Sequence, residues 1–228
     1  MISANDIIQI NLTKQEIIEC LQKAVNHKFI DNLRNRHPNV QFDCKLRGYV
    51  GEYAIRKWFN TNGITIEATD YLKDGDNIDI DFLVKGRIIE LKTSLMPDND
   101  KSFADVINNR DIKLIKRGQQ SINELKGDIH MQIYFNQKTK AKDNWLKMQD
   151  INLTNDTEYL YTKFRADAYL NTTMLVAWID KGTLINYIDT LPEGKQHWTF
   201  AGSQREFWKC PLSKCRQPIE IIQYLKQL

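Results

Sequence analysis

Residues 77–93 read NIDIDFLVKGRIIELKT, and this stretch decides how the rest of the chain is interpreted. Polar and apolar residues alternate on both sides of a Lys-Gly pair, which predicts two strands joined by a tight two-residue turn. One face of this hairpin is apolar and suited to packing on a helix, whereas the other face carries carboxylates and an amine. The pattern therefore predicts a half-buried hairpin within a larger sheet.

A two-residue turn at Lys85-Gly86 determines which residues of the hairpin face each other. Asp81 then stands opposite Glu90, and Asp79 stands opposite Lys92. Like charges directly opposite on a sheet repel, so a cation is expected between Asp81 and Glu90. Carboxylate oxygens at such a position are the ligands that Mg²⁺ and Mn²⁺ prefer. A register slip of one residue would break this pairing.

The spacing of these residues, D…E-x-K, resembles the motif of the PD-(D/E)xK nuclease superfamily, also called restriction-endonuclease-like. The resemblance implies that Asp81 and Glu90 bind metal and that Lys92 is the catalytic lysine. An acidic residue on a preceding helix often completes the family's site, and Glu52 matches that position. The proline that the family name places before the aspartate is replaced here by Ile80. The resemblance covers roughly residues 48–136.

The activity implied by the resemblance is hydrolysis of DNA phosphodiester bonds, with Mg²⁺ or Mn²⁺ as the cofactor. The implied metal ligands are Asp81, Glu90, Glu52 and the main-chain carbonyl of Leu91. Lys92 would orient or deprotonate the attacking water and offset the charge of the phosphate. Asp79 is either an outer-sphere metal ligand or the residue that holds Lys92 in position.

Two structural alternatives explain the same residues without catalysis. The hairpin could have a solvated polar face on which Asp79 and Lys92 form a cross-strand ion pair. Leu83 and Ile88 argue against this alternative, because they would expose apolar groups on that face. Glu52 could similarly pair with a neighbouring arginine on the surface of its own helix.

Elements on either side of the hairpin predict an α/β fold. The expected helices cover about residues 14–34, 46–62, 114–125, 158–169 and 218–228, and the further strands cover 64–68, 128–135 and 173–179. This order predicts a mixed central sheet flanked by helices, with the α-β-β-β-α-β core that the nuclease family shares. We expect a single nuclease domain over residues 1–228. Its core would cover about 46–180, with an N-terminal helix over 14–35 and a C-terminal decoration over 181–228.

Composition is that of an ordinary globular protein. The 228 residues are 42% hydrophobic and 27% charged, and the formal net charge is +3. No apolar run is long enough for a membrane span, and residues 1–11 do not resemble a secretory signal. Four scattered cysteines suit a reducing compartment, so a cytoplasmic location is expected.

An acidic metal site that acts on DNA needs basic residues around it. The expected phosphate contacts are Lys113, Lys116, Arg117, Lys138, Lys140 and Lys142. Both clusters of basic residues are also compatible with a solvated helix face or loop.

Other metal sites are weaker interpretations of the sequence. The acidic stretch before the hairpin lacks a ligand at Leu72, where a calcium loop requires one. Cys210 and Cys215, with His197, could hold zinc, although the four-residue gap is long; the alternative is free cysteines. His130 is expected to be an ordinary strand residue.

Three classes of function remain open from the sequence. A type II restriction endonuclease or related defence nuclease is favoured by the size of the chain, and cutting both strands of a palindrome would suggest a homodimer. A repair, recombination or phage endonuclease would use the same residues. A nucleic-acid-binding module without catalysis, or a protein-interaction domain, would not require the repulsive pair of Asp81 and Glu90.

Overall fold

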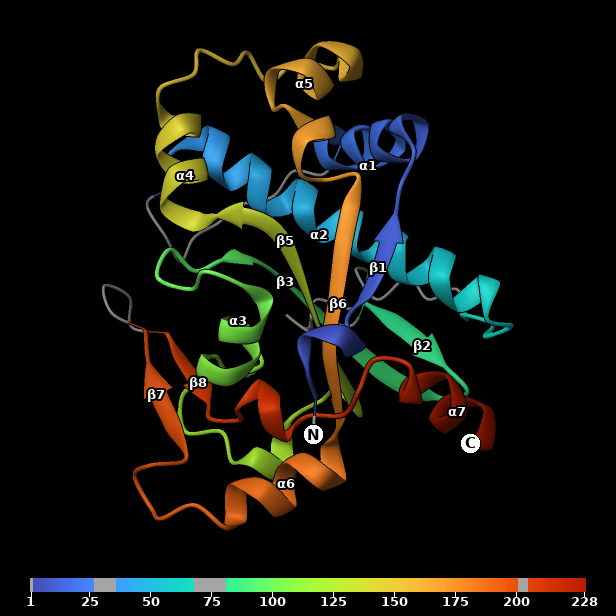
Figure 1. The fold of residues 1–228 in the computed structure, drawn as a ribbon, viewed down its shortest axis with the longest axis vertical. Coiled ribbons are helices and arrows are strands. Elements are labelled where there is room, and N and C mark those ends of the chain that lie inside the picture. The colour runs from blue at the N-terminus through green and yellow to red at the C-terminus, as the bar shows by residue number, and fades with distance from the viewer. Residues whose placement is uncertain (1, 27–35, 68–80, 201–204) are drawn as a thin grey trace.

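The computed structural model describes residues 2–26, 36–67, 81–200 and 205–228. Its central sheet consists of β1 (Ile8–Asn11), β2 (Phe82–Val84), β3 (Arg87–Met96), β5 (Ile129–Lys138) and β6 (Thr172–Asp180). The order across the sheet is β1-β6-β5-β3-β2, and β3 and β5 are parallel while the other neighbours are antiparallel (Figure 1). The expected mixed central sheet is therefore confirmed.

Three short strands form a second, antiparallel sheet. They are β4 (Ile115–Lys116), β7 (His197–Thr199) and β8 (Glu206–Trp208), in the order β4-β8-β7. Two of these strands, β7 and β8, therefore come from residues 181–228, the region expected to follow the core at the C-terminal end. The same region also contributes the helices α6 (Lys181–Asp189) and α7 (Glu220–Gln227), and α7 agrees with the expected last helix.

Helices cover both faces of the central sheet. One face packs on α1 (Lys14–Asn26), α2 (Pro38–Thr61), α4 (Thr139–Lys147), α5 (Thr157–Lys163) and α7, and the other packs on α3 (Phe103–Asn109), α6 and the small sheet. Side chains alternate along β5 between the two faces, so Met131 packs on the α2 side while Tyr134 packs on the α3 side. Two apolar cores therefore share one sheet.

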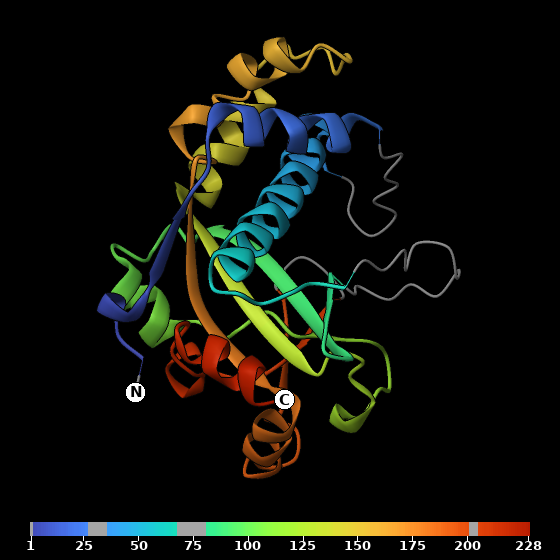
Figure 2. The same ribbon diagram turned by 90° about the vertical axis from the view of Figure 1, so that its right-hand side faces the viewer.

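Close packing of α2 on β3 depends on Gly51. A methyl group at this position would lie 2.5 Å from Thr93 Cγ2 and 3.6 Å from Leu91 Cδ2, so only glycine allows the helix to approach so closely. Figure 2 shows α2 lying against the strands of the sheet. Because Glu52 follows Gly51 directly, this contact also sets how far Glu52 lies from the hairpin.

The turn between β2 and β3 has the predicted form. Lys85 has φ 49° and Gly86 has φ 72°, the two positive values that a two-residue turn of type I′ requires. Phe82 pairs with Ile89 and Val84 pairs with Arg87, which is the register expected from the sequence. The predicted apolar face is buried, since Phe82, Val84, Ile89 and Leu91 are at most 6% exposed.

Gly86→Ala is expected to lower the free energy of unfolding by about 1–2 kcal/mol, because an L-residue is strained at positive φ. Gly48→Ala is the matched control. Gly48 lies inside α2 with nothing within 4 Å of an added methyl group, so this change should raise stability by about 0.5–1 kcal/mol. Urea denaturation of both variants measures the difference. Equal effects of the two substitutions would contradict the turn geometry.

Several expected elements differ from the structure. Residues 114–125 do not form the predicted helix: they hold β4 and a 3-10 turn at Ile122–Glu124, and Gly118 interrupts them with φ 54°. The helix on this side is α3, whose first turn is capped by the Ser102 side chain, an acceptor for the Asp105 amide. The apolar residues of 114–125 pack in the second core without helical periodicity.

The other differences concern boundaries. The second helix begins at Pro38, eight residues before the expected start, because His37 caps it and proline suits its first turn. The expected strand over 64–68 is represented in the described residues by one bridge between Glu67 and Leu83. The helix expected over 158–169 ends at Lys163, since Arg165 has φ 50°.

In the described residues, no helix is long and apolar enough to cross a membrane.

Candidate functional site

Asp81 lies directly before β2, at the edge of the central sheet. Its main-chain N–H donates to the carbonyl of Ile89 (3.2 Å), and its carboxylate Oδ2 accepts from the main-chain N–H of Leu91 (2.5 Å). The paired register of β2 and β3 ends at Phe82 and Ile89, so these two bonds attach Asp81 to the main chain of β3 just beyond that register. Asp81 therefore lies against the segment Ile89–Leu91, while its direct pairing with Glu90 stays a prediction.

The Leu91 carbonyl faces the same edge as the Asp81 carboxylate. The N–H and C=O of one strand residue point to the same side, and they alternate along the strand. Leu91 donates its N–H toward Asp81, while the neighbouring Lys92 carbonyl points the other way and accepts from Gln132 Nε2 on β5 (3.0 Å). The edge of the sheet thus presents a main-chain carbonyl next to a carboxylate.

Glu90 lies between two nitrogen groups. Its Oε1 is 2.9 Å from Lys92 Nζ, and its Oε2 is 3.0 Å from His130 Nδ1. Burial by itself would raise the pKa of Glu90, whose side chain is 12% exposed, but the contacts with His130 and Lys92 outweigh burial and lower its pKa to about 2. Glu90 is therefore a carboxylate at neutral pH, and Lys92 is held directly against it.

His130 is the residue of this site that sequence reasoning missed. It lies on β5 as expected, but the parallel pairing of β3 and β5 places it directly beside Glu90. His130 as a whole residue is 2% exposed. Nδ1 does not form a well-aligned hydrogen bond despite its short distance from Glu90, and Nε2 has no partner in the described part of the chain. The sequence feature that could have pointed to His130 is its position within a run of apolar strand residues.

Glu52 approaches the site from α2. One turn later on this helix, the Arg56 guanidinium lies 5.4 Å from the centre of the Phe82 ring, so this side of α2 faces the hairpin. Burial raises the pKa of Glu52 to about 7, and the negative charge of Asp81 adds to the shift, while Arg56 opposes it. Glu52 and Asp81 are thus close enough for their charges to repel.

Glu52→Gln is expected to stabilise the metal-free protein at pH 8 by about 1–3 kcal/mol, with little effect at pH 4.5. The folded protein holds the Glu52 proton up to about pH 7, whereas an unfolded glutamate loses it near 4.5. Wild-type stability therefore falls as pH rises between these values, and glutamine removes that loss. Thermal melting across pH measures this, with the exposed Glu19→Gln as control; a pH-independent difference would contradict it.

The donor set fits a hard divalent cation chemically. The carboxylates of Glu52 and Asp81 repel each other, and the Leu91 carbonyl lies on the same side as Asp81, all oxygen ligands of the kind that Mg²⁺ takes. Within the described ranges, however, no three His, Cys, Asp or Glu side chains lie close enough together to hold a metal ion. Lys92 is the group that now neutralises Glu90. Asp79 lies outside the described residues.

The six basic residues expected to contact DNA have different environments. Arg117 and Lys140 have exposed side chains. Lys116 forms an ion pair with Glu206 (2.9 Å), and Lys113 Nζ lies over the rings of Trp198 and Phe207 at 5.2 and 5.3 Å.

Lys138 and Lys142 also point toward main-chain carbonyls. Lys138 Nζ donates to the carbonyls of Pro97 and Asp100. Lys142 is only 5% exposed, and its amine donates to the carbonyl of Phe164 (2.9 Å). Burial lowers the pKa of Lys142 to about 8. The structure thus corrects the expectation for Lys142, because an amine enclosed in this way cannot reach a phosphate.

Cys210 and Cys215 come together, as the zinc alternative requires. Their sulfur atoms are 4.0 Å apart and both residues are buried. His197, however, contacts Glu206 (Nδ1 to Oε1, 3.4 Å), and all four cysteines are free thiols. His197, Cys210 and Cys215 therefore do not form one cluster of metal ligands in the described part of the chain.

Comparison of the chain with protein-family models, with curated proteins and with solved structures finds no match. The fold and the site define a mixed α/β protein with an acidic cluster and a lysine at one edge of its central sheet.

Proposed function

We propose that this protein is a Mg²⁺-dependent endonuclease that hydrolyses DNA. The observation that carries the proposal is the arrangement at the sheet edge. Asp81 is bonded to the main chain on both sides of Glu90, and Lys92 is in direct contact with Glu90. The repulsion between Asp81 and Glu52 beside the Lys92–Glu90 pair costs stability in a purely structural sheet, but it suits a site that binds a cation and a phosphate.

The order of elements supports the same proposal. A long helix, a hairpin, a helix and a strand parallel to the second hairpin strand follow one another as α2, β2, β3, α3 and β5. This order resembles the expected nuclease core, with the first strand reduced to the bridge at Glu67.

Each residue has a distinct role in the proposed reaction. Asp81, Glu90 and the Leu91 carbonyl would hold the cation, and Glu52 would join them once its proton has left. A bound Mg²⁺ supplies polarisation of the scissile phosphate and a lower pKa for its water. Lys92, once it has moved off Glu90, would offset the negative charge of the phosphate and orient the attacking water.

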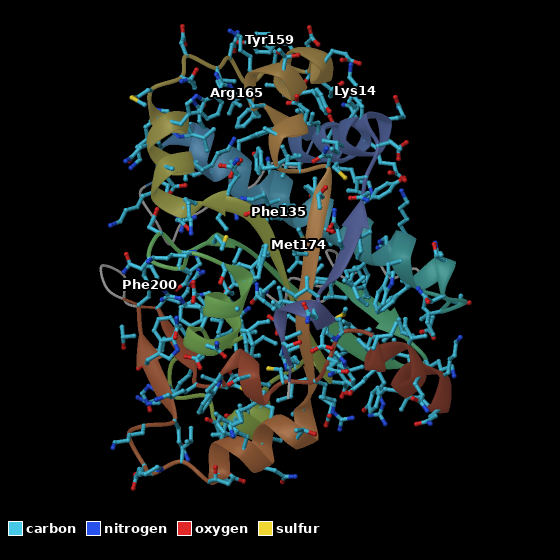
Figure 3. All side chains as sticks on the ribbon, viewed as in Figure 1. Lys14, Phe135, Tyr159, Arg165, Met174 and Phe200 are labelled. Carbon is cyan, nitrogen blue, oxygen red and sulfur yellow. The ribbon has the colours of Figure 1, made fainter. Side chains whose placement is uncertain are left out.

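The experiment is cleavage of plasmid DNA by the purified protein in Mg²⁺ and in EDTA. We expect cleavage in Mg²⁺, none in EDTA, and none by the Asp81→Ala/Lys92→Ala double variant. The matched control is Lys14→Ala/Glu158→Ala, which removes the same two charges from an exposed ion pair (2.7 Å) at the far end of the molecule, where Figure 3 labels Lys14. Cleavage by the Asp81/Lys92 double variant at the wild-type rate would refute the proposal.

The ends of the cut DNA then decide the biological role. A fixed sequence at every end would identify a restriction endonuclease, and a palindromic sequence would indicate a homodimer. Scattered or branch-dependent ends would instead identify a repair, recombination or phage nuclease.

A nucleic-acid-binding module without catalysis is the second candidate. It would bind DNA through exposed basic residues such as Arg117 and Lys140. Mn²⁺ separates the two candidates, because only a real metal site raises the melting temperature when the ion is added.

A further inference from the structure

The two oxygens of Glu90 face different partners. Oε1 is directed toward Lys92 Nζ (2.9 Å) and Oε2 toward His130 Nδ1 (3.0 Å). The lysine reaches the site from the same strand, whereas the histidine comes from the neighbouring strand, 40 residues later in the chain. Glu90 therefore has one oxygen near the sheet edge and one that is turned toward the interior.

The chemistry of the contact determines where the imidazole carries its proton. A carboxylate only accepts hydrogen bonds, so the ring nitrogen that faces Glu90 Oε2 must carry the hydrogen. This Nδ1 contact is short but not a well-aligned hydrogen bond, and the other nitrogen, Nε2, is buried and has no hydrogen-bond partner among the described residues. A buried histidine with an unsatisfied nitrogen costs free energy, which makes it a poor choice for a residue that only fills the core.

The ring is also held in place by packing. A methyl group on Gly127 would lie 2.8 Å from His130 Cε1 and 3.3 Å from Glu90 Cβ. The absence of a side chain at Gly127 thus makes room for the imidazole beside Glu90. The segment before β5 and the end of the hairpin are shaped around this contact.

We propose that His130 is a positioning residue for the metal site, whose Nδ1–H faces Glu90 Oε2 at 3.0 Å and leaves Oε1 as the oxygen that binds the cation. This inference rests on the proposed function. It assigns a role to a residue outside the D…E-x-K motif, and it implies that Glu90 binds the cation through a single oxygen. Partners of this kind, one step removed from the metal, typically change metal affinity by about 10–100-fold.

The test compares His130→Leu with His130→Asn. Leucine removes both nitrogens, whereas asparagine keeps an N–H donor on the atom bonded to Cγ, where Nδ1 stands in histidine. The readout is the Mn²⁺ concentration that gives half of the maximal rise in melting temperature, which does not depend on catalysis. We expect the leucine variant to need about 10–100-fold more Mn²⁺ and the asparagine variant to recover most of the wild-type response.

Gly127→Ala is a second route to the same result, because it keeps the imidazole but displaces the ring. It also serves if the leucine variant does not fold, and it should weaken the Mn²⁺ response in the same direction. A wild-type Mn²⁺ response in both His130→Leu and Gly127→Ala would overturn the role of His130, as would equal weakening by leucine and asparagine. A wild-type protein that Mn²⁺ does not stabilise would overturn the proposed metal site itself, and this inference with it.

Discussion

Lys92→Met is expected to lower the rate of Mg²⁺-dependent DNA cleavage by about 10²- to 10⁴-fold while it tightens the binding of Mn²⁺. The two effects have opposite signs because Lys92 has two roles. Its amine lies 2.9 Å from Glu90 Oε1, where it competes with a metal ion for the same oxygen, and in the reaction it would act on water and phosphate. Methionine has a similar length but no charge. The variant therefore loses both the cation that competes with the metal for Glu90 Oε1 and the amine that would act in the reaction.

Cleavage rates and calorimetric titration with Mn²⁺ measure the two effects separately. Lys14→Met is the control, since it removes an exposed lysine from an ion pair with Glu158 at a distant surface. If the Lys92 variant bound Mn²⁺ more weakly than the wild type, Lys92 would not be a competing cation. If it cleaved DNA at the wild-type rate, Lys92 would have no part in the chemistry.

Asp81→Asn should reduce cleavage by about 10³-fold, because a ligand that contributes several kcal/mol of charge stabilisation is lost. The amide keeps an oxygen that can accept from the Leu91 N–H, so the hairpin should keep its register. Removal of the negative charge beside Glu52 should also lower the pKa of Glu52 from its value of about 7. The variant therefore combines a large catalytic loss with a small gain in stability near neutral pH.

The two consequences of Asp81→Asn are measured by cleavage and by thermal melting as a function of pH. In the metal-free variant, the loss of stability with rising pH should end at a lower pH than in the wild type. Asp98→Asn, on an exposed loop, serves as the control with the same chemical change. Unchanged titration of Glu52 would show that Asp81 and Glu52 do not share a site.

The hairpin was predictable because its determinants are local. Alternation over residues 82–91 and the Lys-Gly turn specify a register that needs no information from the rest of the chain. Strands β5 and β6 were equally recognisable as apolar runs. Local patterns were misleading over 114–125, where apolar residues fill the second core through an irregular path that Gly118 interrupts.

The site was only partly predictable because some of its contacts are not local. Asp81, Glu90 and Lys92 lie in or next to one hairpin, so residues close in sequence bring them together. His130 reaches Glu90 through a parallel pairing of distant strands, and nothing in the sequence specifies that register. Lys142 shows the converse problem: its charge suggested a surface contact, but burial against Phe164 is a property of the packed chain.

The central claim is that the edge formed by Asp81 and Glu90 binds a divalent cation in competition with Lys92. Its most direct test is a crystal structure of the protein grown with Mn²⁺, read from the anomalous signal of the ion. We predict one Mn²⁺ bound to Asp81 and to Glu90 Oε1, with Lys92 Nζ moved away from the 2.9 Å contact. A crystal at saturating Mn²⁺ that shows no ion at this edge and an intact Lys92–Glu90 pair would contradict the account.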